Sequence, residues 1–154
     1  MPALPWTSFT EAEDDKEYAA LLSRLPLATF RAMPKFLRFV FGIRRQLADS
    51  EGLIGYSLDA HPLAKEFWTL SVWEDRDSLW RFVQKMPHSR AMQDLLPHMK
   101  QTEFFHFEVR GSSFLRTGKK PSAACVSAWR MPHLGQPGPD PWQWPEPTTS
   151  RRAR

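Results

Sequence analysis

The chain has 154 residues, of which 42% are hydrophobic and 13% aromatic, and its formal net charge is +4 at pH 7. This length accommodates one domain, and the apolar content suffices for a compact core, which excludes a wholly disordered protein. The single cysteine, Cys125, excludes an internal disulfide framework and a cysteine cluster, so no metal site is expected.

The positive charge is unevenly distributed along the chain. Residues 111–154 contain seven Lys or Arg and two acidic residues, a balance of about +5, which leaves residues 1–110 at about −1. A nucleic-acid-binding domain carries its basic residues on the domain itself, so no nucleic-acid partner is expected. No apolar run approaches the roughly 20 residues of a membrane span, and the first residues lack the pattern of a secretory signal. These features predict a cytoplasmic protein without a membrane span.

Hydrophobic periodicity predicts a polar lead-in at residues 1–16, followed by a domain at residues 17–110. Pro34 fits the first turn of a helix, and Asp75 is a suitable N-cap for the next one. The apolar stripe of the first helix consists of Phe36, Phe39, Val40, Ile43 and Leu47. Arg45 lies off this stripe, and Arg44 and Arg45 are expected on a solvated face. The stripe of the next helix consists of Leu79, Phe82, Val83 and Met86, and its continuation after Pro87 carries Ala91, Met92 and Leu95. The expected elements are a strand at 18–27, a helix from 34, strands at 53–60 and 67–73, a helix from 76 that breaks near Pro87 and continues to 97, and a strand at 102–109.

The order β-α-β-β-α-β predicts an α+β, ferredoxin-like fold, an antiparallel sheet with both helices on one face. Such a sheet leaves its other face bare in a monomer. A large exposed apolar face is unusual in a soluble monomer, so we expect two sheets to pair in a homodimer.

The strand at 67–73 is the most informative segment, because its side chains alternate between two different faces. One face, with Trp68, Leu70 and Val72, is apolar and is expected beneath the helices. The other face is aromatic at its ends and hydroxylated in the middle, as in the wall of a ligand pocket. Its members, Phe67, Thr69, Ser71 and Trp73, are candidate substrate-binding residues, with core packing as the alternative for the two aromatic ones.

Residues 111–154 have a different character. Seven of the 14 prolines and four of the seven glycines lie there, without helical or alternating periodicity. This composition predicts a basic, mostly disordered extension. Its three tryptophans could dock on the domain, although a tail without a role is favoured.

His88 is the candidate catalytic residue. It follows Pro87 at the start of a helix, where the helix dipole disfavours the imidazolium and lowers the pKa. A neutral imidazole can accept a proton or bind a ligand near pH 7. The alternative is that His88 caps the helix or bonds to a backbone carbonyl.

Several of these residues together resemble the antibiotic biosynthesis monooxygenase superfamily. The resemblance rests on Ser71-Val72-Trp73-Glu74, Ser78-Leu79, Phe82-Val83, His88 and Ala91-Met92, and it covers residues 18–110. It is closest to uncharacterised bacterial members placed near spheroidene monooxygenase. It implies a dimeric α+β barrel, and it adds Phe82 to the substrate-binding candidates.

The resemblance implies a small monooxygenase-like enzyme for a hydrophobic aromatic or polyene molecule, without a cofactor. The alternative is a non-catalytic protein that binds haem or another flat apolar ligand. Haem-degrading members place a tryptophan where this chain has Phe82, and they use an asparagine, a residue type that this chain lacks. The sequence therefore disfavours haem degradation and leaves haem binding open. An RNA-binding sheet of the same topology is disfavoured because the strand at 65–72 lacks the required aromatic signature.

Overall fold

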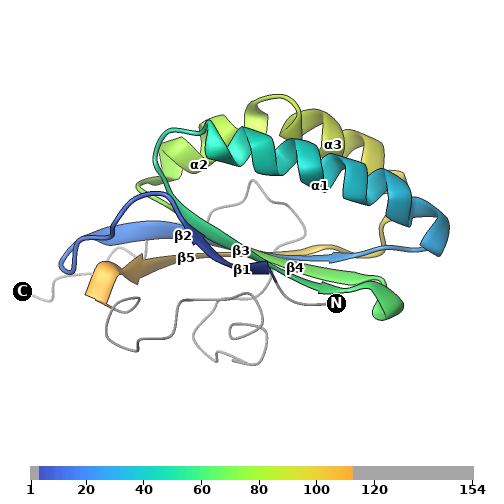
Figure 1. Ribbon diagram of the computed structural model, residues 1–154, viewed down its shortest axis with the longest axis horizontal. Coiled ribbons are helices and arrows are strands. Elements are labelled where there is room, and N and C mark those ends of the chain that lie inside the picture. The colour runs from blue at the N-terminus through green and yellow to red at the C-terminus, as the bar shows by residue number, and fades with distance from the viewer. Residues whose placement is uncertain (1–3, 113–154) are drawn as a thin grey trace, which may run out of the picture.

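Figure 1 shows the computed structural model, which describes residues 4–112 of the chain. This part consists of strands, three α-helices and short 3-10 turns. The strands are β1 (Leu4–Ser8), β2 (Glu17–Pro26), β3 (Leu53–His61), β4 (Glu66–Trp73) and β5 (Glu103–Arg110). The helices are α1 (Met33–Ala48), α2 (Arg76–Gln84) and α3 (His88–Leu95), and the turns are η1 (Phe30–Ala32), η2 (Pro62–Ala64) and η3 (Leu96–His98).

The described strands form one antiparallel sheet in the order β1-β3-β4-β2-β5. β4 is paired with β3 on one side and with β2 on the other, and β2 also pairs with β5. Apart from β1, the chain order and the pairing are those of the ferredoxin-like arrangement. The predicted α+β fold class is therefore confirmed.

The fifth strand, β1, lies within the segment that the sequence predicted as a polar lead-in. It pairs with the edge of β3, and Trp6 packs so closely over Gly55 that a side chain at position 55 would collide with the indole. A strand of five residues that contains Pro5 has little periodicity to detect. An edge position tolerates that proline because one side of the strand needs no ladder hydrogen bonds.

All three α-helices cover the same face of the sheet (Figure 1). This face carries Phe67 and Trp73, which pack against α1 and α2: the rings of Phe36 and Phe67 are 4.3 Å apart, and those of Trp73 and Phe82 are 4.9 Å apart. The prediction that Trp68, Leu70 and Val72 lie beneath the helices is therefore wrong. Alternation separates two faces of a strand, but it does not say which face the helices cover when both are apolar.

The helix boundaries follow local signals. Pro34 lies in the first turn of α1, and the Asp75 carboxylate accepts a 2.7 Å hydrogen bond from the backbone N–H of Ser78, which confirms Asp75 as the N-cap of α2. That hydrogen bond is the largest cause that lowers the pKa of Asp75. Met86, which was expected on the buried stripe, lies beyond the end of α2 and is 56% exposed.

None of the helices in the described part of the chain is long and apolar enough to cross a membrane. The predicted basic extension lies outside the described residues, except for Gly111 and Ser112.

Candidate functional site

A cavity of about 150 Å³ lies between the sheet and the three helices. All five positions of the apolar stripe predicted for α1 contribute to its lining, namely Phe36, Phe39, Val40, Ile43 and Leu47. The predicted stripe of the helix after Pro87 contributes Ala91, Met92 and Leu95. These predicted helix faces are therefore confirmed, and they contribute both to the core and to the lining of the cavity.

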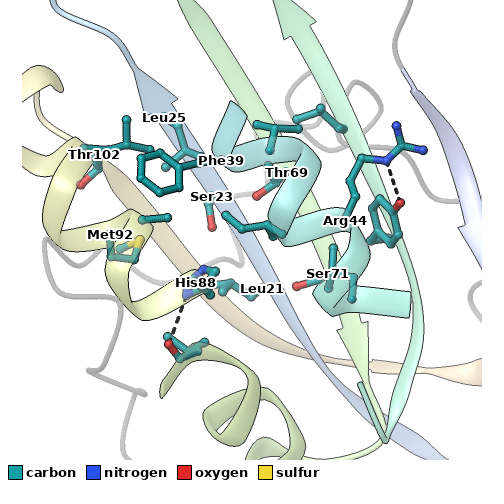
Figure 2. A pocket seen from close by; sticks show the side chains of 18 of the residues that line it. Leu21, Ser23, Leu25, Phe39, Arg44, Thr69, Ser71, His88, Met92 and Thr102 are labelled. Atoms are coloured by element: carbon teal, nitrogen blue, oxygen red, sulfur yellow. Dashed lines mark hydrogen bonds between the residues drawn. The ribbon is translucent and has the colours of Figure 1, made fainter. Parts of the chain in front are cut away.

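The floor of the cavity is formed by the middle of the sheet, where small hydroxylated side chains replace large apolar ones. Thr69 of β4 is directly opposite Ser23 of β2, and Ser71 of β4 is opposite Tyr56 of β3. Ser23, Thr69 and Ser71 all line the cavity, and Figure 2 shows their hydroxyls beneath α1. The hydroxyls of Thr69 and Ser71 have no hydrogen-bond partner among the described residues. They are available to a ligand.

The two aromatic ends of β4 do not line this cavity. Phe67 and Trp73 are 1% and 0% exposed, and each belongs to a cluster of core side chains. The prediction that they bind substrate is therefore not supported, and their packing role is established instead. The indole N–H of Trp73 is buried without a hydrogen-bond partner among the described residues, which costs stability.

His88 lines the cavity at the junction of α2 and α3. Its Nδ1 is 3.2 Å from the backbone carbonyl oxygen of Val83, and its backbone N–H donates to the side-chain oxygen of Gln46 at 2.9 Å. A carbonyl oxygen only accepts, so the proton of the neutral ring is on Nδ1. Nε2 then carries a lone pair that has no hydrogen-bond partner among the described residues. The alternative considered from the sequence was that His88 bonds to a backbone carbonyl. In the structure His88 makes such a bond and also lines the cavity.

Burial lowers the pKa of His88 below its usual value of 6.5, and the hydrogen bond to Val83 opposes this shift. Desolvation is therefore the principal cause, rather than the helix dipole invoked from the sequence. An unfolded chain takes up this proton near pH 6.5, whereas the folded chain resists it. The contribution of neutral His88 to stability is therefore present above about pH 6.5 and is lost as the pH falls toward the lower folded pKa.

Phe82 connects the core to the cavity. It lines the cavity as predicted, and its ring is 4.9 Å from the ring of Trp73 and 4.8 Å from that of His88. Trp73 thus supports His88 through Phe82 without reaching the cavity.

Arg44 is a cavity residue that the sequence analysis placed on the solvated face of α1. Its Nε donates to the hydroxyl of Tyr56 at 3.2 Å, and both residues line the cavity. In Figure 2, Thr69 and Ser71 lie between His88 and Arg44. Helical spacing would have revealed the position, because Arg44 is one turn after Val40 on the cavity-facing stripe.

No acidic side chain lines the cavity in the part of the chain that the structure describes, and Arg44 is the one permanently charged residue there. The described residues also contain no group of three or more His, Cys, Asp or Glu that could hold a metal ion. The cavity is thus an apolar space with hydroxyls on its floor, one neutral imidazole and one cation.

No protein-family model and no curated protein matches the chain. Solved structures do match. A protein described as a monooxygenase from Lactobacillus acidophilus is 13% identical, with a TM-score of 0.55, and the match covers 66% of this chain and 48% of that one. This chain therefore corresponds to about half of that protein.

Two smaller proteins match over nearly their whole length. SnoaB, a cofactor-independent oxygenase from Streptomyces nogalater, is 16% identical, with a TM-score of 0.52 and coverage of 61% of this chain and 94% of SnoaB. An antibiotic biosynthesis monooxygenase is 13% identical, with a TM-score of 0.53 and coverage of 58% and 95%. At these identities, the comparisons show that the chain shares the fold of antibiotic biosynthesis monooxygenase structures.

Partial filling of the cavity is expected to stabilise the protein. Side chains that line an underpacked apolar space lack contacts on one side, so added apolar volume there is stabilising. Replacement of Ser71 by valine suits a strand and adds apolar volume to the floor. We expect Ser71→Val to raise the free energy of unfolding by about 1 kcal/mol, measured by thermal and denaturant unfolding.

The matched control is Ser8→Val on the exposed edge strand, which is expected to change stability by less than about 0.5 kcal/mol. A lower melting temperature for Ser71→Val than for the unmodified chain would contradict the account of an underpacked floor.

Proposed function

We propose that this chain is a small oxygenase-like enzyme that acts on a hydrophobic aromatic molecule in the cavity beneath the helices, without a bound cofactor. The observation that carries the proposal is the unpaired Nε2 of a neutral, partly buried His88 in an apolar cavity floored by hydroxyls. The shared fold with SnoaB, a cofactor-independent oxygenase, is consistent with it. A nearer relation to spheroidene monooxygenase stays a prediction.

The cavity volume favours an aromatic substrate over a polyene. A cavity of about 150 Å³ accommodates one aromatic ring, whereas pockets for drug-sized ligands have volumes of roughly 300–1,000 Å³. The proposed substrate is therefore a compact, electron-rich ring system.

In the proposed reaction, His88 Nε2 accepts a proton from an acidic C–H or O–H of the substrate. The resulting anion is the electron donor to O₂. One oxygen atom enters the substrate at the ring C–H carbon para to the phenolate oxygen and forms a quinone carbonyl, and the other oxygen leaves as water with the hydrogens of that C–H and of the phenolic O–H. The protein contributes binding, exclusion of water and the proton acceptor, while the substrate supplies the electrons. Thr69 and Ser71 are proposed to orient the oxygen substituents of the substrate.

His88→Gln tests the proposed proton acceptor. We expect oxygen consumption with a panel of one- and two-ring phenols, including catechol and 1-naphthol, to fall at least about 100-fold. In the unmodified protein the rate should rise with pH through a pKa below 6.5 and become constant near pH 7, because only the neutral ring accepts a proton. His98→Gln, at an exposed histidine, is the control.

Unchanged oxygen consumption in His88→Gln, or consumption no higher with the unmodified protein than in buffer alone, would contradict the proposed reaction.

The second candidate is a non-catalytic binding protein for haem or another flat apolar ligand. The free Nε2 of His88 favours a ligand-binding role, since a neutral imidazole can coordinate iron. The cavity does not fit haem, because its volume is below that of ordinary drug-sized sites. We expect haemin to give no Soret band with the purified protein. A Soret band that disappears in His88→Gln would contradict this expectation and favour the binding role.

We also propose that the protein is a homodimer, formed through the sheet face that the described helices leave uncovered. Because the helices cover the face of Phe67 and Trp73, the proposed contact moves to the opposite face, where Trp68, Phe105 and Phe107 are partly exposed. We expect light scattering at micromolar concentration to give twice the chain mass, and Phe105→Glu to reduce it to one chain mass by burying an unpaired charge.

Leu63→Glu is the control for this experiment, because Leu63 is 92% exposed in the turn η2. A monomer mass for the unmodified protein would contradict the proposed dimer.

A further inference from the structure

Arg44 is a partly buried cation that no carboxylate of the described residues neutralises. Arg24, on β2, bonds to both Glu66 and Glu103 at 3.0 and 3.1 Å. Arg44 has no acidic oxygen within 4.0 Å among the described residues, and its only side-chain hydrogen bond is the one to Tyr56.

The bond to Tyr56 uses one donor of the guanidinium and leaves the others free. Nε donates to the Tyr56 hydroxyl, so the two terminal nitrogens, which form the fork that binds a carboxylate or a phenolate, have no partner among the described residues. Tyr56 is 8% exposed and its ring stacks on that of Phe9 at 6.0 Å. Tyr56 therefore fixes the guanidinium at the edge of the cavity, on the side away from His88 (Figure 2).

No other side chain of the described cavity lining neutralises the charge of Arg44. It contains no acidic residue in the described part of the chain, and the hydroxyls on its floor are neutral. The remaining walls are apolar and accommodate about one aromatic ring. An oxyanion attached to such a ring would place its charge at Arg44 and its carbon body against the apolar walls.

We infer that Arg44, positioned by Tyr56, is the specificity determinant of the cavity and selects aromatic ligands that carry an oxyanion, either a carboxylate or a phenolate. This inference rests on the proposed function only in taking the cavity as the ligand site. It concerns which ligands bind, and it is independent of whether they react with O₂.

Benzoate and benzamide are the matched probes, because they have the same shape and differ in charge. Their dissociation constants are measured by NMR titration with the full chain, with Arg44→Gln, with Arg44→Lys and with Arg45→Gln. Arg45, the neighbouring residue on α1, is exposed and does not line the cavity, so Arg45→Gln is the matched control. Thermal unfolding of each variant establishes that it is folded.

We expect the unmodified chain to bind benzoate at least about tenfold more tightly than benzamide, a difference of about 1.4 kcal/mol. Arg44→Gln should reduce this ratio to about twofold or less, with the affinity for benzamide unchanged. Arg44→Lys should retain part of the preference, because lysine keeps the charge but lacks the planar fork. Arg45→Gln should retain all of it.

Equal affinities in the unmodified chain, the absence of binding by both probes, or equal losses in Arg44→Gln and Arg45→Gln would overturn the inference. The proposed function fails differently. Oxygen consumption that depends on His88 without any preference for benzoate would retain the function and reject the role of Arg44. A preference for benzoate that depends on Arg44, without oxygen consumption, would retain the role of Arg44 and reject the proposed function.

Discussion

The site depends on one feature of β4, the placement of large aromatic rings at both ends of its helix-facing side and small hydroxylated residues between them. Phe67 packs against Phe36 of α1, and Trp73 packs against Phe82 of α2. Between these two contacts, the small side chains of Thr69 and Ser71 line the cavity. The rings therefore hold the helices away from the middle of the sheet, and the cavity is the space that results.

This enclosure sets the chemistry of the side chains at the edge of the cavity. Burial keeps His88 neutral by lowering its pKa, and the Val83 carbonyl holds the proton on Nδ1 so that Nε2 is free. The same low-dielectric surroundings increase the effect of a single unneutralised cation, Arg44, on any charged ligand. Packing by Phe67 and Trp73 thus supports a function to which neither residue contributes directly.

Much of the fold was predictable, because periodicity and capping act locally. Most of the helix stripes, the Asp75 cap and the order of the elements from residue 17 onward follow from residue spacing, and the resemblance indicated the same fold. The short edge strand β1 was missed. The sequence could not show which face of β4 the helices cover, since both faces carry large apolar side chains. Thr69, Ser71, Phe82 and His88 line the cavity and Phe67 and Trp73 do not, and a role in ligand binding or catalysis stays a prediction. Arg44 was missed because a charged residue on a helix is usually solvated.

The most direct test of the cavity as a ligand site is long-range ¹H–¹⁵N NMR of the His88 imidazole, recorded at pH 7 with and without benzoate. We expect a neutral ring protonated on Nδ1, with an unprotonated Nε2 whose ¹⁵N shift changes when benzoate is added. A ring protonated on Nε2, or an Nε2 shift that benzoate leaves unchanged at saturation, would contradict this expectation.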